Sequence, residues 1–180
     1  MVVRTVCALL ALPLLAPAGA ASQDYPIPAD VASPEAVILA AYDAIAHAPG
    51  ENFDWDRFRS LHLPGALLVP NTEQTGGTPR VLSVQEFIDW IDGITEAEAA
   101  IGSEADKGFV EEQVHIALDR YGDVAQAMST YEKHYWGEDQ ILGRGVNSFS
   151  LVFRDDRWWI VSIVWDEEDG AGPIPDAYLP

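Results

Sequence analysis

The spacing of hydrophobic residues changes once along the chain, from a helical period in the first half to strict alternation in the second. Apolar residues recur three and four positions apart over 34–45 and 84–94, and they alternate with polar residues from 110 to 165. The first spacing predicts helices buried on one face, and the second predicts strands. The predicted order is two helices, two short strands, a helix and four long strands. This order predicts an α+β fold, with a curved antiparallel sheet wrapped around the N-terminal helices in one domain over 33–168.

Capping residues mark where the predicted helices begin. Ser33 stands before a proline and a glutamate, so it is expected to cap the first helix. Asp54 is the candidate cap of a short second helix. Ser83 and Glu86 have the spacing of a capping box at the start of the third helix, and Gly102 is expected to end it.

The last two predicted strands, 145–153 and 157–165, are dense in β-branched and aromatic residues and are separated by Arg154, Asp155 and Asp156. This pattern predicts a hairpin. Simple alternation places large apolar side chains on both faces: Trp158, Ile160 and Val164 on one, and Trp159, Val161, Ile163 and Trp165 on the other. Both faces must then be covered, and a second copy of the chain is the expected cover of the outer face, giving a homodimer.

The first 21 residues have the pattern of a secretory signal peptide. Arg4 supplies the positive charge, 5–17 is an apolar run too short to span a membrane, and Ala18-Gly19-Ala20 fits a cleavage site. We expect cleavage near Ala20 and a periplasmic or secreted mature chain with no membrane span. The only cysteine, Cys7, lies in this leader, so no disulfide is expected. Residues 22–32 are predicted to form an extended arm, and 169–180 a C-terminal tail.

The chain is strongly acidic. Its 10 basic and 29 acidic residues give a formal net charge of −19, and loss of the leader removes one arginine and no acid, which brings the charge to −20. Such a chain is not expected to bind nucleic acid electrostatically. No zinc-binding spacing, nucleophile elbow or phosphate-binding glycine loop is present in the sequence. We therefore expect no metal and no cofactor.

Several motifs together resemble the nuclear-transport-factor-2-like, or SnoaL-like, superfamily, and within it an exported bacterial branch. They are Tyr121-Gly122-Asp123-Val124-Ala125, Ser129-Thr130-Tyr131-Glu132, Arg144-Gly145-Val146-Asn147-Ser148, Arg157-Trp158-Trp159-Ile160-Val161-Ser162 and Trp165-Asp166-Glu167. The resemblance spans 33–180 and implies a cystatin-like cone. Members include isomerases, dehydratases, cyclases, hydrolases and non-catalytic modules, so the fold does not decide the function. Their enzymes place an Asp or His inside the cone, and none of those sets matches this chain residue by residue.

Two histidines lie in the first pair of long strands. Pairing through the turn at 121–123 places His115 near 128–130, and places His134 opposite Phe109 or Glu111. His134 beside Glu111 is either an oriented general base or part of a salt bridge at the rim of the sheet. His115 faces away from its two apolar neighbours in the strand, so it lies on the outer face if they face the core.

Glu112 shares a strand face with aliphatic residues if the strand alternates without interruption. These are Val110, Val114, Ile116 and Leu118. A carboxylate among aliphatic groups is costly unless it is paired, and its pKa rises, which is a common origin of catalytic acids and bases. Glu112 either lines the cavity in this way, or lies where the strand end reaches water or an arginine.

Ser129, Tyr131, Asn147 and Trp165 complete the candidates for a ligand pocket. Asparagine is depleted in strands, so Asn147 either binds a ligand or bonds a neighbouring strand at a bulge. Trp165 either packs in the core or a dimer surface, or stacks on a ligand.

A curled sheet closed by helices encloses a cavity, and the chain is therefore expected to be an exported protein that binds a small hydrophobic molecule there. One alternative is a cofactor-free lyase, isomerase or cyclase that uses acid-base residues in the cone. The other is a non-catalytic dimerisation or partner-docking module. Two or more titratable groups converging in a closed pocket favour the enzyme, whereas a cavity filled by Phe, Trp and Leu side chains favours the module.

Overall fold

A computed structural model describes residues 24–100 and 107–180. The expected signal peptide and the expected helix end at Gly102 lie outside these residues. No helix in the described part of the chain is both long enough and apolar enough to cross a membrane.

The fold is α+β, as predicted, with one six-stranded sheet. The helical elements are η1 (Pro28–Val31, a 3₁₀ helix), α1 (Pro34–Ala44), α2 (Trp55–Leu61), α3 (Val84–Ala100), α4 (Glu168–Ala171) and η3 (Asp176–Tyr178, also 3₁₀). The strands are β1 (His62–Val69), β2 (Leu82–Ser83), β3 (Val110–Tyr121), β4 (Val124–His134), β5 (Gly143–Arg154) and β6 (Arg157–Glu167), in the spatial order β2-β1-β6-β5-β4-β3. All pairs are antiparallel except β1 with β6, which run parallel.

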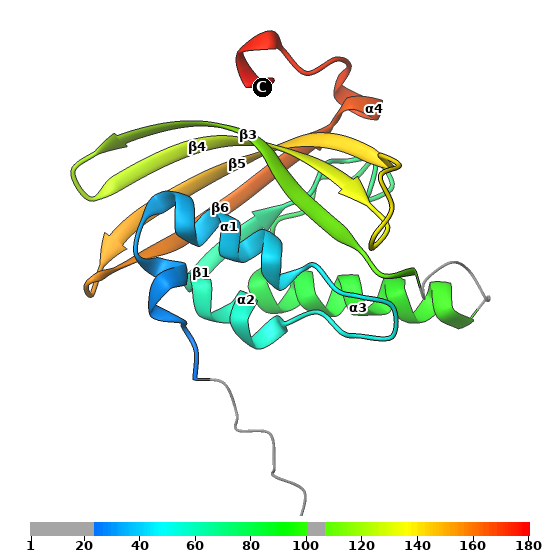
Figure 1. Cartoon of the computed structure of the whole chain (residues 1–180), viewed down its shortest axis with the longest axis horizontal. Coiled ribbons are helices and arrows are strands. Elements are labelled where there is room, and N and C mark those ends of the chain that lie inside the picture. Colours follow the sequence, from blue (N-terminus) through cyan, green and yellow to red (C-terminus); the bar gives the residue numbers. More distant parts are fainter. Residues whose placement is uncertain (1–23, 101–106) are drawn as a thin grey trace, which may run out of the picture.

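The curved sheet separates two layers. Helices α1, α2 and α3 lie against its concave face, and the C-terminal segment with η3 crosses the opposite face (Figure 1). Contacts of η3 with β3 and β4 hold that segment in place, and Thr130 donates a hydrogen bond of 2.5 Å to the backbone oxygen of Tyr178. The C-terminal segment therefore covers part of the outer face itself.

The predicted helix caps are confirmed. Ser33 accepts a hydrogen bond from the Ala36 amide, and Asp54 accepts one from the Arg57 amide. At the start of α3, the Glu86 carboxylate accepts from the Ser83 amide at 2.8 Å while the Ser83 hydroxyl accepts from the Glu86 amide, which is a reciprocal capping box.

The N-terminal arm is not extended throughout. Residues Pro28–Val31 form one 3₁₀ turn, and Asp30 in that turn is buried against α2. Its carboxylate accepts two hydrogen bonds from the guanidinium of Arg57, at 2.7 and 3.0 Å. The turn is therefore held by a bidentate ion pair, which the proline-rich sequence does not reveal.

The β5–β6 hairpin forms as predicted, with a two-residue turn. Asp155 and Asp156 both have positive φ, 53° and 58°, the conformation that matches the twist of a tight hairpin. Aspartate tolerates this left-handed region better than bulky residues do.

Two β-bulges interrupt the alternation of strand faces. In β3, Gln113 pairs with Tyr131 but His115 pairs with Thr130, so Val114 is an extra residue. In β6, Ser162 pairs with Ser150 but Ile160 pairs with Leu151, so the residue between them, 161, is also extra. Each bulge exchanges the inner and outer faces of its strand, because the side chains of a strand have a period of two.

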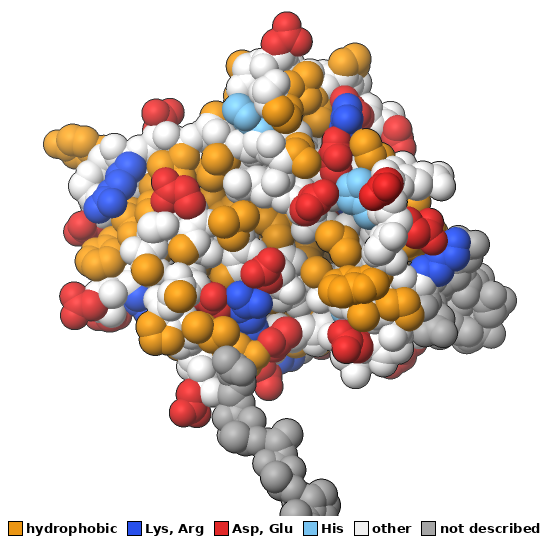
Figure 2. All heavy atoms as spheres, viewed as in Figure 1, with side chains coloured by type: hydrophobic (Ala, Val, Ile, Leu, Met, Phe, Trp, Pro, Cys, Tyr) orange, Lys and Arg blue, Asp and Glu red, His pale blue; other side chains and the backbone are white. Residues whose placement is uncertain are grey.

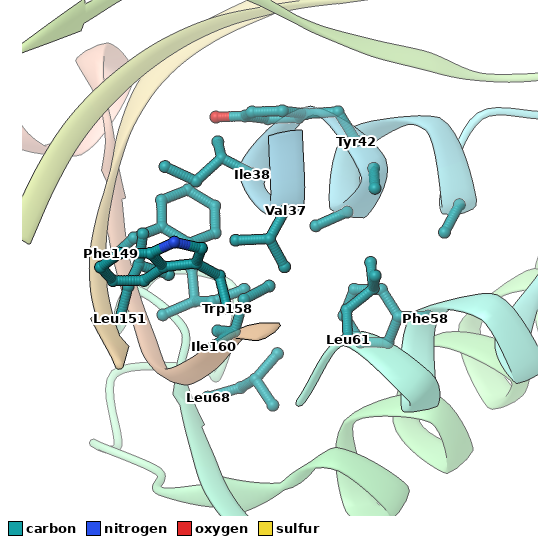
Figure 3. Close-up of a cluster of buried hydrophobic side chains, with 14 of the residues drawn as sticks. Val37, Ile38, Tyr42, Phe58, Leu61, Leu68, Phe149, Leu151, Trp158 and Ile160 are labelled. Atoms are coloured by element: carbon teal, nitrogen blue, oxygen red, sulfur yellow. The ribbon is translucent and has the colours of Figure 1, made fainter. Parts of the chain in front are cut away.

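The predicted division of the hairpin's large apolar groups between the two faces is wrong, because the bulge in β6 exchanges those faces part-way along the strand. Trp158 and Ile160 before the bulge, and Ile163 and Trp165 after it, all lie on the helix side of the sheet. Figure 3 shows Val37 and Ile38 of α1 facing Phe149, Leu151, Trp158 and Ile160 of the strands, with Phe58, Leu61 and Leu68 nearby. The core thus accommodates most of the hairpin's apolar residues on one face.

Candidate ligand cavity

A cavity of about 720 Å³ lies between the three helices and the concave face of the sheet. Its walls are largely apolar, and its aromatic lining includes Phe53, Trp55, Phe58, Phe87, Trp90 and Trp165. This size and lining are typical of sites for small organic molecules. A cavity of this kind could hold a ligand without any change in the fold.

Glu111 of β3 is the acidic group of a chain of hydrogen bonds at the cavity wall. Its Oε1 accepts a hydrogen bond of 3.1 Å from the Asn147 amide, which also donates to the Tyr42 hydroxyl at 3.1 Å. Ser129 lies 2.8 Å from the Tyr42 hydroxyl and donates its own proton to Gln113. Tyr42 must therefore donate to Ser129, so the phenol proton points away from Glu111 and the Asn147 amide is the group in this chain that donates to the carboxylate.

Burial raises the pKa of Glu111 to about 7, and the negative charge of Glu167 adds to the effect. The hydrogen bond from Asn147 and the charge of Lys133 act in the opposite direction but do not compensate. Glu111 is half-buried because its side chain borders the cavity rather than bulk solvent. Near neutral pH this carboxyl is therefore able both to give and to take a proton.

Burial, and then the charge of Glu111, also raise the pKa of Tyr42. The phenol therefore stays protonated across the physiological range, as its donor role in the chain requires. Among the described residues, no second hydrogen bond from this chain reaches the Glu111 carboxylate, so the pKa of that carboxyl stays raised.

A second polar group surrounds Glu167 on the same wall. The Lys133 ammonium lies 2.6 Å from one of its carboxylate oxygens, and the Gln74 amide donates to the other at 2.8 Å. The Tyr131 hydroxyl makes a longer contact of 3.4 Å, and Trp165 donates to Gln74 at 2.9 Å. Glu167 is thus a paired carboxylate, in contrast to Glu111, and Gln74 ties the 71–78 loop to the cavity.

Gly145 makes room for this second group. A Cβ atom at this position would collide with the Tyr131 hydroxyl and with the backbone oxygen of Asp166. The absence of a side chain therefore allows Tyr131 to lie across β5 into the cavity.

The sequence matches no protein-family model and no curated protein. Solved structures do match. An NTF2-like protein with a cystatin-like fold from Novosphingobium aromaticivorans is 15% identical, with a TM-score of 0.50 over 66% of this chain and 71% of that one. The yeast UBP3-associated protein BRE5 is 12% identical, with a TM-score of 0.50 over 74% and 92%. An NTF2-like protein of unknown function from Silicibacter pomeroyi is 18% identical, with a TM-score of 0.46 over 74% and 91%.

The chain has the NTF2-like, or cystatin-like, fold. This agrees with the resemblance seen in the sequence motifs. At these identities the similarity establishes the fold alone, because proteins of one fold carry unrelated functions.

Within the NTF2-like fold, four of the predicted pocket residues lie on the inner side of the sheet. Tyr131, Asn147 and Trp165 line the cavity, as predicted. Ser129 is fully buried behind Tyr42 and does not reach the cavity surface. The Asn147 amide donates to Tyr42 and to Glu111 at the cavity wall, so it bonds side chains there rather than a strand backbone at a bulge.

The other three predicted residues lie on the outer face. The prediction that Glu112 faces the cavity is wrong: its side chain is 60% exposed and lies 3.6 Å from His134. His134 pairs with Val110 rather than with Glu111, so it cannot act on a ligand in the cavity. His115 pairs with Thr130, within the predicted range, and is likewise outside. The bulge at Val114 is the physical reason, because it reverses the faces of 110–113 relative to 116–118.

Four residues that line the cavity and belong to its polar groups were not among the predicted pocket residues: Tyr42, Gln74, Lys133 and Glu167. Glu111 was predicted only as a partner of His134. Uninterrupted alternation would place Glu112 on the cavity face, whereas the bulge at Val114 places Glu111 there. No residue type in 110–118 marks the position of that bulge. Tyr42 lies within the apolar pattern over 34–45, which does not distinguish it as a polar group of the cavity.

Replacing Glu111 by glutamine is expected to stabilise the ligand-free protein at pH 8. A carboxyl whose folded pKa is raised weakens the fold as pH climbs from the unfolded value, 4.5, through about 7. The gain in unfolding free energy is expected to be near zero at pH 4 and on the order of 3 kcal/mol at pH 8. Glutamine keeps the oxygen that accepts from Asn147. Chemical denaturation at both pH values measures the difference.

Glu112→Gln is the matched control, since it removes the neighbouring carboxylate from the exposed face. It is expected to change the stability at pH 8 by much less than Glu111→Gln does. If Glu111→Gln behaved like this control, Glu111 would not be buried as a costly charge.

Proposed function

We propose that this protein is an exported protein that binds a small, mostly apolar molecule in the cavity, with Glu111 as the group that exchanges a proton with it. The observation that carries the proposal is a carboxyl whose pKa is raised to about 7 at the wall of an aromatic-lined cavity. A buried carboxyl whose pKa is raised to near 7 destabilises the fold at higher pH. Strongly shifted pKa values of this kind cluster at functional sites.

The lining supports one orientation of the ligand. Aromatic rings from α2 and α3 form one part of the wall, and Glu111, Asn147, Lys133 and Glu167 lie together on the sheet. A ligand with an apolar ring and one polar edge matches this division, with the ring against the helices and the polar edge at Glu111.

A cofactor-free reaction by acid-base catalysis is the second candidate. Glu111, Lys133, Tyr131 and Glu167 are titratable groups that converge on one cavity wall, which favours this alternative over a non-catalytic module. Glu111 would take a proton from one atom of the ligand and return it to another, as isomerases, lyases and cyclases require.

Binding in the cavity can be tested with the neutral fluorescent probe N-phenyl-1-naphthylamine, excited through the tryptophans that line the cavity. We expect saturable binding to one site. Thr95 lines the cavity and Glu96, the next residue of α3, is exposed and does not. Thr95→Trp is therefore expected to weaken binding about tenfold by filling the cavity, whereas Glu96→Trp is expected to leave it unchanged. Equal binding by the two variants would contradict a site in the cavity.

The same probe tests the part played by Glu111. A neutral apolar molecule in the cavity further desolvates the carboxylate, so wild-type affinity is expected to fall as pH rises from 5 to 8. This dependence is expected to vanish in Glu111→Gln. A pH dependence that persisted in that variant would assign the proton to another group.

We also propose export with cleavage near Ala20, on the evidence of the leader pattern at Arg4, the apolar run and Ala18-Gly19-Ala20. Sequencing the N-terminus of the protein isolated from its host is expected to begin near Ala21. An intact Met1 in the cytoplasmic fraction would contradict export.

A homodimer through the outer sheet face is a further proposal. Val124 and Val164 are 50% and 44% exposed on that face, beyond the part covered by the C-terminal segment. Exposed apolar groups on a sheet favour association with a second copy. Sedimentation at micromolar concentration is expected to give twice the monomer mass, and a monomer at high concentration would exclude the dimer.

A further inference from the structure

A second polar cluster lies on the outer face of the sheet, away from the cavity. It consists of Glu112 of β3 with Glu132 and His134 of β4. The Nε2 atom of His134 lies 3.6 Å from Oε1 of Glu112 and 3.8 Å from Oε2 of Glu132. One ligand atom from each of the three residues lies within 4.8 Å of the other two. Three potential metal ligands therefore converge on one point between two adjacent strands.

The His134 ring has no ordinary role in the described structure. The residue is 9% exposed, and neither ring nitrogen has a hydrogen-bond partner within the described part of the chain. A buried imidazole normally makes at least one hydrogen bond, because burial without one costs free energy. The Nε2 atom of His134 faces two carboxylates that lie beyond hydrogen-bond distance. A metal ion could lie between the nitrogen and the two carboxylate oxygens.

The cluster brings two carboxylates close together on adjacent strands. Glu112 and Glu132 are directly opposite each other in the β3–β4 register, and like charges in that position are destabilising. Arg144 lies beside them, and both of its contacts go to Oε1 of Glu132. Oε2 of Glu132 and the carboxylate of Glu112 are thus directed at His134 rather than at Arg144.

The distances match a small tetrahedral metal ion. Zinc ligands at about 2.0–2.2 Å from the ion stand roughly 3.3–3.6 Å apart in a tetrahedral site. The 3.6 Å distance from His134 to Glu112 lies at the upper end of this range, and the 3.8 Å distance to Glu132 exceeds it by 0.2 Å. The Glu112 side chain is 60% exposed and can adjust its position. A hollow of about 220 Å³ adjoins the cluster and is lined by Glu112, His134, Glu138 and Asp139. It leaves a fourth coordination position open to water or to a further carboxylate.

We propose that Glu112, Glu132 and His134 form a binding site for a divalent transition-metal ion of the zinc class, on the opposite side of the sheet from the cavity. The imidazole nitrogen with two carboxylate oxygens suits zinc better than magnesium or calcium, which take oxygen ligands and more of them. The ion would join β3 to β4 at the end where the cavity lies on the other face. This site goes beyond the proposed cavity function and does not depend on it.

Isothermal titration of the mature chain with Zn²⁺, without a histidine tag, tests the site. We expect one site per chain, and at least tenfold weaker binding in Glu112→Gln and in His134→Asn. Because Glu112 is exposed, its replacement leaves the fold intact even if His134→Asn does not fold. His115→Asn is the matched control, since it removes a histidine from the outer face of β3, the strand that carries Glu112. Its affinity is expected to stay within twofold of the wild type.

Two further measurements separate a defined site from general attraction to an acidic protein. Co²⁺ is expected to give the visible absorption of a four-coordinate ion in the wild type and not in Glu112→Gln, and a tenfold excess of Mg²⁺ is expected to leave Zn²⁺ binding unchanged. Zinc binding that is equal in Glu112→Gln and His115→Asn, or that Mg²⁺ abolishes, would overturn the proposal.

Discussion

The candidate site is organised around one carboxyl group, that of Glu111, at the wall of an apolar cavity. Removing a carboxylate from water is costly, and here a single hydrogen bond from Asn147 is the direct compensation. Tyr42 and Ser129 fix the Asn147 amide from behind, so the orientation of Glu111 is set by residues of α1, β4 and β5 together. These three elements together thus position one titratable group.

The fold separates a packed end from an open end. Near the β5–β6 turn, Trp158, Leu151 and Ile160 fill the space between the sheet and α1. Towards the other end of the strands the same layers diverge, and aromatic rings line a cavity rather than close it. The surface carries acidic side chains scattered over the face seen in Figure 2, with few basic ones among them. This distribution supports solubility rather than recognition of a polyanion.

Local sequence signals predicted most of the fold. Ser33, Asp54 and the Ser83–Glu86 box mark helix starts because capping depends on neighbouring residues alone. The site was predicted only in part, because strand alternation cannot locate a bulge. The extra residue Val114 places Glu111 rather than Glu112 on the cavity face. The extra residue in β6 places Trp158 and Trp165 on the same face. A bulge depends on how neighbouring strands pair, which is a property of the whole sheet.

The pKa of Glu111 itself is the most direct test. Carboxyl carbon chemical shifts of the protein labelled with ¹³C at glutamate, assigned by comparison with Glu111→Gln, report this value between pH 3 and 9. The structure predicts a midpoint near 7 for Glu111, with this signal absent from the spectrum of the variant. A midpoint near the ordinary value of 4.5 for Glu111 would show that water reaches the carboxylate freely, and would contradict the account of the cavity as the functional site.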